Sequence, residues 1–197
     1  MTDTGAIELD GRDITFMPQH TRAREIGRLY QDPMRGTAPG MTIEENLALA
    51  AGKGGWLSHT TRQEKERFRE ELKKLDIGLE KRMSHPVGLL SGGQRQALTL
   101  LMATMNPPKL LLLDEHTAAL DPKTAAKVLE TTDMIVNRDH LTTIMITHNM
   151  KDAIAHGNRL IMLMDGKIIL DIKGEEKKKL TVEDLLHQFE KASGEEF

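Results

Sequence analysis

The fold of this chain is decided by residues 90–115, LSGGQRQALTLLMATMNPPKLLLLDE. This stretch joins a Ser-Gly-Gly segment, an amphipathic run and a continuous apolar run that ends in two carboxylates. Leu110 to Leu113 show no alternation of apolar and polar residues, which is typical of a strand covered on both faces. A helix followed by a buried strand indicates an α/β fold with a mostly parallel sheet.

The residues after this stretch continue the alternation of strands and helices. Asp121 and Pro122 supply an N-cap and a first-turn proline for a helix that extends to about Val136. The remaining expected elements are a strand over 143–147, a short helix over 150–156, a hairpin of strands 160–164 and 168–172, and a final helix capped by Thr181 and Asp184. The lysines at 177–179 follow two glutamates, and we expect them to face solvent.

The residues before the stretch contain weaker signals. Asp10-Gly11 predicts the turn of a short hairpin within residues 6–16. Thr42 with Glu45 has the form of a capping box, which predicts a helix over 42–51 that the glycines of residues 52–55 close. A second helix is expected to start at Thr61, with a narrow apolar seam of Phe68, Leu72 and Leu75 on an otherwise charged, solvated surface.

Composition excludes several classes of protein. The 197 residues carry 27 basic and 30 acidic side chains, a net charge of −3, so no bulk positive field exists to bind nucleic acid. No apolar run approaches the ~18 residues that cross a bilayer. Zero cysteine excludes disulfides and thiolate chemistry, and the first residues lack the features of a signal peptide. The cytoplasm is therefore the expected compartment.

The Ser-Gly-Gly segment is the first candidate site. Gly92 and Gly93 just inside a helix start allow close backbone approach, and the first helical amides converge with the Ser91 hydroxyl on one small region. Such a helix terminus attracts phosphate. Gln94 belongs to the same string. The alternative interpretation is a simple Ser-Gly-Gly helix cap.

The two carboxylates that follow the buried strand form a second candidate site. A strand that ends at the carboxyl edge of an open α/β sheet places its last side chains where such sheets bind ligands. Asp114 is a plausible Mg²⁺ partner, directly or through water. Glu115 can orient or deprotonate a water that attacks a γ-phosphate, which makes it the candidate general base. The alternative is a pair of acids that only cap backbone amides.

Three further polar residues occur in order along the chain. Gln31 follows an early strand, and its amide can contact metal, water or phosphate from a loop. Asp121 lies six residues beyond Glu115. His148 ends the strand over 143–147 and can donate to a phosphate oxygen. Taken singly, each residue also suits an ordinary surface or loop role.

Together these segments resemble the nucleotide-binding domain of ABC-transporter ATPases. Gln31 matches the Q-loop, residues 90–94 the signature motif, residues 110–115 the Walker B motif with its catalytic Glu, residues 119–121 the D-loop and His148 the H-loop. The resemblance covers the chain from Gly5 onward. It implies a P-loop NTPase-like, RecA-like core with an inserted helical subdomain.

The resemblance also implies a domain organisation and a set of roles. Residues 1–30 would be a remnant of the N-terminal core strands, 31–90 the Q-loop and helical subdomain, 91–173 the ATPase core and 174–197 a C-terminal helix. The implied roles are catalysis by Glu115 and His148, metal binding by Asp114 and Gln31, and nucleotide contacts by Gln31, Ser91, Gly92, Gly93, Gln94 and Asp121. The implied cofactors are ATP and Mg²⁺.

One family motif is absent from these 197 residues. The Walker A string G-x-x-x-x-G-K-[ST] does not occur, since Gly52-Lys53 is followed by Gly54. We therefore expect a truncated family member whose first strands and P-loop are missing and which does not hydrolyse ATP by itself. The missing strand and helix should leave apolar surface exposed along residues 110–113 and 143–147.

The resemblance leaves several functions to weigh. The first is an ATP-binding subunit of a bacterial importer for a small organic solute, which completes a composite site with the Walker A of a partner ATPase in a homo- or heterodimer. The second is a non-catalytic module that docks on transporter membrane subunits or on an intact ATPase. A chromosome-maintenance ATPase is disfavoured because no sustained heptad run exists. Either of the first two would lie at the inner face of the cell membrane, without nucleic acid.

Overall fold

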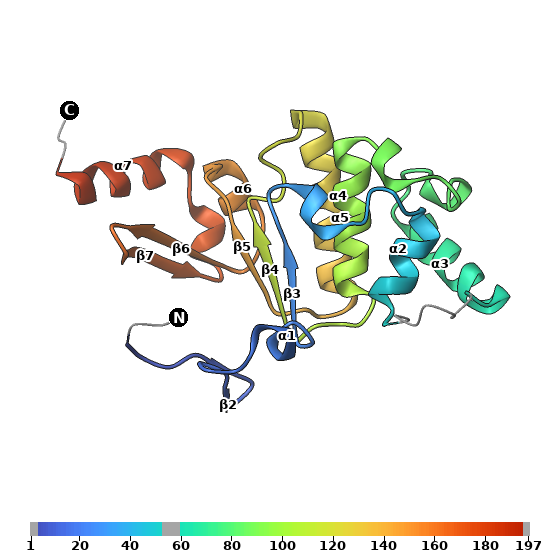
Figure 1. The fold of residues 1–197 in the computed structure, drawn as a ribbon. Coiled ribbons are helices and arrows are strands. Elements are labelled where there is room, and N and C mark those ends of the chain that lie inside the picture. Colours follow the sequence, from blue (N-terminus) through green and yellow to red (C-terminus); the bar gives the residue numbers. More distant parts are fainter. Residues whose placement is uncertain (1–3, 53–59, 195–197) are drawn as a thin grey trace. The chain divides into compact units, whose positions relative to one another are not determined.

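The computed structural model describes residues 4–52 and 60–194, which belong to two compact units (Figure 1). The first unit is Met1–Ile146 and the second is Thr147–Phe197. Of the helices in the described ranges, none combines the length and the apolar character that a bilayer crossing requires.

The first unit is built on a parallel sheet of three strands. Its order is β3 (Ile26–Leu29), β4 (Leu110–Asp114) and β5 (Thr143–Ile146). Leu29 is the register partner of Leu113, and Asp114 is that of Ile146, so all three strands end at the same edge. The predicted parallel sheet is thus confirmed here, with β5 one residue shorter than expected.

Of the five helices in the described part of the first unit, four begin within one residue of their predicted starts, and α1 was not predicted. They are α1 (Gln19–Arg22), α2 (Ile43–Ala50), α3 (Arg62–Lys74), α4 (Gly92–Thr104) and α5 (Pro122–Arg138), with short 3₁₀ turns at Pro33–Gly36, Leu79–Lys81 and Val87–Leu89. Capping boxes at Thr42 and Thr61 open α2 and α3. Of the glycines expected to close the first of these helices, Gly52 has a positive φ of 82°, and the others lie outside the described residues.

Helices α4 and α5 lie on one side of this sheet (Figure 1). Leu111 and Leu113 point toward that side and are buried. Side chains alternate along a strand, so Leu112 and its register partner Ile144 belong to the opposite face. On that face Ile144 is 52% exposed and Ile146 is 55% exposed. The predicted exposure of apolar surface is therefore correct for β5 and wrong for Leu111 and Leu113, because α4 covers them.

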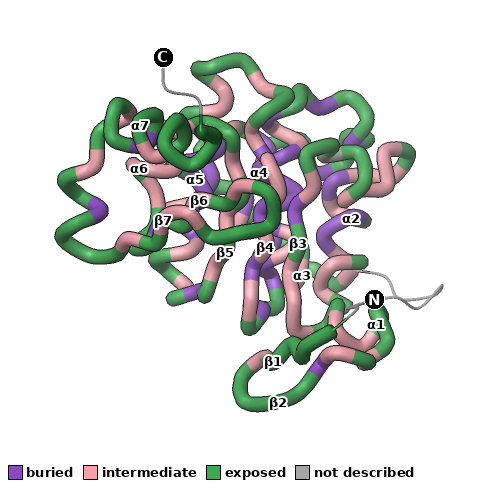
Figure 2. Tube along the Cα trace, turned by 90° about the vertical axis from the view of Figure 1, so that its left-hand side faces the viewer, coloured by how far each residue is buried: buried purple, intermediate pink, exposed green. Residues whose placement is uncertain are grey.

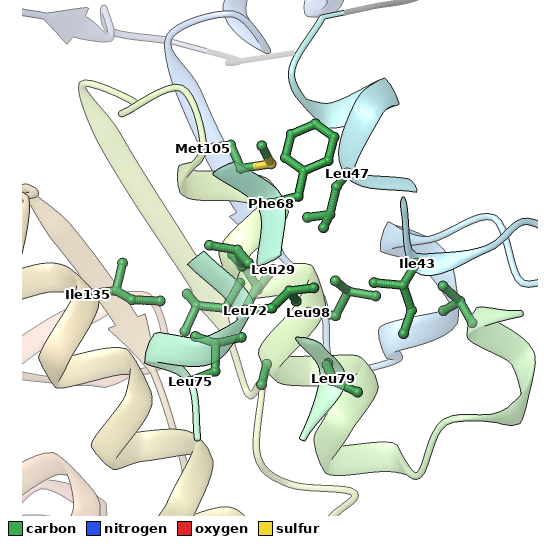
Figure 3. Close-up of a cluster of buried hydrophobic side chains, with 14 of the residues drawn as sticks. Leu29, Ile43, Leu47, Phe68, Leu72, Leu75, Leu79, Leu98, Met105 and Ile135 are labelled. Carbon is green, nitrogen blue, oxygen red and sulfur yellow. The ribbon is translucent and has the colours of Figure 1, made fainter. Parts of the chain in front are cut away.

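The core of the first unit joins the sheet to the helices between β3 and β4. Leu29 on β3 and Leu98 on α4 belong to one buried cluster with Leu72 and Phe68 from α3 (Figure 3). Buried residues gather along α4 and the strands beside it (Figure 2). Two residues of the predicted apolar seam of α3, Phe68 and Leu72, are buried, and the third, Leu75, caps its end and is buried as well.

A two-residue turn forms the hairpin predicted at the start of the chain. Strands β1 (Glu8–Leu9) and β2 (Arg12–Asp13) pair antiparallel, with Leu9 opposite Arg12. Asp10 and Gly11 have φ values of 54° and 71°, as the type I′ turn of such hairpins requires. The sequence signal Asp-Gly was therefore sufficient to locate this turn.

The second unit contains a helix, a hairpin and a terminal helix. Its elements are α6 (Met150–Ala155), β6 (Arg159–Met164), β7 (Lys167–Lys173), a 3₁₀ turn at Lys177–Lys179 and α7 (Val182–Ser193). β6 and β7 pair antiparallel around Asp165-Gly166. The predicted capping box of Thr181 and Asp184 opens α7. Helix α7 packs against α6 and β7.

Lys177 does not face solvent, so this prediction was wrong. The residue is only 3% exposed, and its Nζ donates hydrogen bonds to the carbonyl oxygens of Ile154 and His156 at the end of α6. Burial lowers the pKa of Lys177 below its usual value. Carbonyls at a helix C-terminus lack partners within the helix and attract cations, which explains why one lysine of the run turns inward.

Candidate nucleotide site

The Ser-Gly-Gly segment forms the start of α4. Ser91 is its N-cap, and the Ser91 Oγ accepts a hydrogen bond from the Gln94 amide at 3.3 Å. The Gln94 Oε1 accepts from the Ser91 amide at 3.2 Å, and its Nε2 donates to the Ile77 carbonyl at 3.4 Å. The helix-cap interpretation is thus correct, and it leaves the amides of Gly92 and Gly93 at the helix start, where an anion is favoured.

Close packing explains why two glycines follow Ser91. A Cβ at Gly93 would lie 2.1 Å from the Thr124 Cγ2 of α5, so the Thr124 side chain or the helix would have to shift. A Cβ at Gly92 would lie 3.1 Å from the Leu120 Cδ2. The glycines therefore let the start of α4 approach residues 120–124. This contact brings the signature segment beside Asp121.

Asp121 is the N-cap of α5. Its Oδ1 accepts a hydrogen bond from the Thr124 amide at 3.1 Å, and Pro122 occupies the first helical position. Hydrogen bonds from Thr124, first from its side chain and then from its amide, hold the pKa of Asp121 below its usual value. The carboxylate is exposed. It is therefore an ionised, fixed group next to the signature segment.

Asp114 ends β4 and meets a cation that no sequence signal indicated. The Nη2 of Arg28 on β3 lies 3.4 Å from the Asp114 Oδ2, and the Arg28 guanidinium lies 4.7 Å from the ring centroid of Tyr30. Both charged side chains are nearly half exposed, so the pair contributes at most ~1 kcal/mol. Only the register of β3 against β4, which the sequence does not specify, brings the two residues together.

The residues near Asp114 fit a magnesium ion better than a metal that needs an all-protein cage. Among the described residues, no cluster of three or more His, Cys, Asp or Glu side chains could hold a metal. Mg²⁺ is commonly bound by one or two carboxylates, with waters and substrate phosphates as its other ligands. Asp114, as a single accessible carboxylate, meets that requirement, and Arg28 would have to release it.

Glu115 has an unusual backbone conformation. Its φ is 46°, in the left-handed region that a non-glycine residue seldom adopts. The Glu115 amide donates to the Ile146 carbonyl at 3.0 Å, and the Ala118 amide donates to the Glu115 carbonyl at 3.0 Å. The chain thus turns sharply at the end of the sheet. Such strain is common at functional sites.

Gln31 lies at the same edge of the sheet as Glu115. Leu29 and Leu113 are register partners, and Gln31 and Glu115 each follow two residues later. Gln31 is exposed, and the carbonyl of the preceding Tyr30 accepts a bond from the buried Gln96 of α4 at 3.4 Å. The structure therefore brings Gln31, Asp114 and Glu115 to one edge of the sheet.

His148 belongs to the second unit, where it is exposed and precedes the α6 N-cap Asn149. It follows the last residue of β5 by two positions, so the chain connects it to the same sheet edge. The other candidate residues belong to the first unit. Its contact with a γ-phosphate remains a prediction.

One cavity in the described part of the chain lies apart from these residues. Its volume is about 340 Å³, and its walls come from α3, α4 and the end of α5. Arg138 there bonds Glu71 and Asp139, and this pairing raises the pKa of Arg138 and lowers that of Asp139. None of the predicted site residues lines this cavity.

Comparison with known proteins identifies the family. Residues 1–118 match the family model described as ABC transporter. The chain belongs to this family. Among ABC proteins it is 47% identical to the tyrosine transport ATP-binding protein of Clostridioides difficile strain R20291, over 96% of this chain and 76% of that protein. It is 36% identical to the choline transport ATP-binding protein OpuBA of Bacillus subtilis strain 168, over 84% of this chain and 42% of that protein.

A solved ABC structure has the same fold. The dimeric ATP-binding cassette MJ0796, in a post-hydrolysis state with ADP and Pi, matches with a TM-score of 0.70 and 27% identity. The match covers 87% of this chain and 74% of that chain. The P-loop NTPase-like α/β fold is thus confirmed, and the chain is an ATP-binding subunit of an ABC transporter.

Proposed function

We propose that this chain serves a transporter for a small organic solute of the amino-acid class and supplies one half of an ATP site formed between two subunits. The solute class is supported by the 47% identity to a tyrosine transport protein. The observation that supports the second part is the packing of Gly92 and Gly93 against residues 120–124, which brings the start of α4 beside Asp121. MJ0796, which has the same fold, is dimeric with bound ADP and Pi.

The proposed roles follow from the chemistry of each group. Ser91 and the amides of Gly92 and Gly93 would hold the γ-phosphate of an ATP that the opposite subunit binds. Gln94 would act by holding the Ser91 cap in place, and Asp121 would take part in communication between the two subunits of the dimer. These groups fit phosphate because the cap fixes them and because Ser91 and Gly92 are exposed, whereas Gly93 is buried against Thr124.

A second set of groups would act on a nucleotide bound to the same subunit. Asp114 and Gln31 would hold Mg²⁺ and its water, Glu115 would polarise the attacking water and His148 would donate to the γ-phosphate. When bound, Mg²⁺ neutralises charge on the phosphates. Because the 197 residues contain no G-x-x-x-x-G-K-[ST] string, we propose that this chain alone does not hold the triphosphate or hydrolyse it.

An apolar patch supports docking on membrane subunits. Leu89, in a 3₁₀ turn, is 75% exposed, and Met34 is also exposed. Arg95 on α4 connects the two segments, since its guanidinium contacts the Met34 sulfur and donates to the Gly88 carbonyl at 3.1 Å. A displacement of this patch would therefore be transmitted through Arg95 to α4, the helix that carries the signature segment. We place the chain at the inner face of the membrane on this basis.

The test is to mix this chain with the tyrosine transport protein of Clostridioides difficile, at a dilution where that protein turns over ATP slowly. The chain is expected to raise turnover severalfold and to form a mixed dimer, while hydrolysing no ATP alone. Ser91→Asp keeps a good N-cap but sets a negative charge against the phosphate, so it should abolish the stimulation. Ser91→Asn, which caps without charge, is the matched control for folding.

The outcomes separate the two functions that the sequence leaves open. Equal stimulation by Ser91→Asp and the unchanged chain would contradict phosphate binding at this helix start. A mixed dimer without any change in turnover would instead support the non-catalytic interaction module, for which the exposed patch of Met34 and Leu89 is the supporting observation.

A further inference from the structure

His116 directly follows the candidate base Glu115 and is buried. It is 2% exposed, and its Nε2 lies 3.2 Å from the Oγ1 of Thr132 on α5. Sixteen residues separate the two side chains in sequence. The contact therefore ties the turn after β4 to the middle of a long helix.

The direction of this hydrogen bond follows from the partners of Thr132. A threonine hydroxyl has one proton. The Thr132 Oγ1 donates it to the Val128 carbonyl at 2.8 Å. The lone pairs of the Thr132 Oγ1 can still accept a hydrogen bond, so the His116 Nε2 must carry a hydrogen and donate it. The bond thus fixes both the orientation of the imidazole and the protonation of this nitrogen.

The turn that His116 anchors is the one that holds Glu115 in the left-handed region. Glu115 has a φ of 46°, and the backbone of this turn is held by its hydrogen bonds to Ile146 and from Ala118. A strained residue keeps such a conformation only where its surroundings enforce it. His116 is the neighbouring side chain that is both buried and hydrogen-bonded to another element.

We propose that His116 is a positioning residue for Glu115. The His116–Thr132 bond holds the turn after β4 in its observed conformation. That conformation fixes the backbone that carries the Glu115 carboxylate. The catalytic meaning of this arrangement rests on the proposed function, whereas the arrangement itself does not.

Amide hydrogen exchange of the unliganded chain tests the proposal. Thr132→Val removes the acceptor of the His116 hydrogen bond, which we expect to speed exchange of the Glu115 and Ala118 amides about tenfold beyond any global change. Thr131→Val is the matched control. Thr131 is a buried neighbour on the same helix, and its Oγ1 makes the same bond, to the Lys127 carbonyl at 2.8 Å. Thr131→Val should speed exchange of the Glu115 amide no more than it speeds exchange over the whole chain.

A second pair of variants tests rescue. His116→Gln keeps a side-chain N–H donor of similar reach, and His116→Leu keeps bulk without a donor. We expect His116→Gln to retain slow exchange and the backbone chemical shifts of Glu115, and His116→Leu to lose both. Equal effects of the two His116 variants, or of the two threonine variants, would overturn the proposal. Because no nucleotide is present, its failure would leave the proposed function untouched, and failure of the mixing experiment would leave this proposal standing.

Discussion

Glu115→Gln is expected to lower ATP turnover by about 100-fold or more in a form of this chain extended with a G-x-x-x-x-G-K-[ST] loop. The glutamine keeps the size of the side chain and its place at the end of β4, but it cannot accept a proton from water. Mg-ATP affinity should change little, because phosphate and metal are held by other groups. Steady-state turnover and equilibrium nucleotide binding measure the two quantities separately.

Glu130→Gln is the matched control for this substitution. Glu130 is an exposed carboxylate on α5 that pairs with Lys127, so the same chemical change there should alter neither quantity. Turnover that persists in Glu115→Gln would refute the assignment of the base. Loss of nucleotide affinity together with turnover would instead assign Glu115 to binding.

Leu113→Ala is expected to reduce the free energy of unfolding by about 2–5 kcal/mol. Leu113 is 1% exposed on β4 and belongs to the cluster formed by the sheet and the helices that cover it. Removing its side chain loses apolar burial and leaves a cavity that the surrounding helices fill only in part. Denaturant unfolding followed by circular dichroism would measure the change.

Ile144→Ala provides the contrast on the other face of the same sheet. Ile144 is about half exposed, so its truncation should cost about 1 kcal/mol or less. A loss from Ile144→Ala as large as that from Leu113→Ala would show that the open face of β5 is packed against apolar groups. The difference between the two variants therefore tests which face of the sheet carries the core.

Elements whose signals are local could be predicted from the sequence. Thr42 with Glu45 and Thr61 with Glu64 satisfy helix-start amides within four residues, so their capping boxes form wherever the chain folds. Asp10-Gly11 determines a hairpin turn in the same way, since both residues accept a positive φ. The family, too, could be inferred from the order of the nucleotide motifs along the chain, which does not depend on how distant residues pair.

Features that depend on pairing between distant residues could not be predicted. The contact of Arg28 with Asp114 follows from strand register, which carries no local sequence signal. Lys177 belongs to a run of lysines that is typical of a solvent-exposed segment. Its hydrogen bonds to the carbonyls at the end of α6 nevertheless hold it in a buried position. In both cases the sequence neighbours of a charged residue do not indicate its partners, which lie elsewhere in the fold.

The glycines of the signature segment combine one feature that could be predicted from the sequence with one that could not. Their position just inside a helix start was predicted from Ser91 and the residues that follow. Their packing requirement was not, because it comes from Thr124 on a helix that begins thirty residues later. The motif thus combines a helix cap and a close helix contact, and only the helix cap can be predicted from the sequence.

We propose that these 197 residues carry the signature segment and the water-activating edge of a nucleotide site without the loop that grips the triphosphate. Equilibrium titration of the purified chain alone with Mg-ATP tests it most directly. We expect no saturable binding up to about millimolar nucleotide, which corresponds to a binding free energy weaker than about −4 kcal/mol. Stoichiometric binding with a micromolar dissociation constant would contradict it.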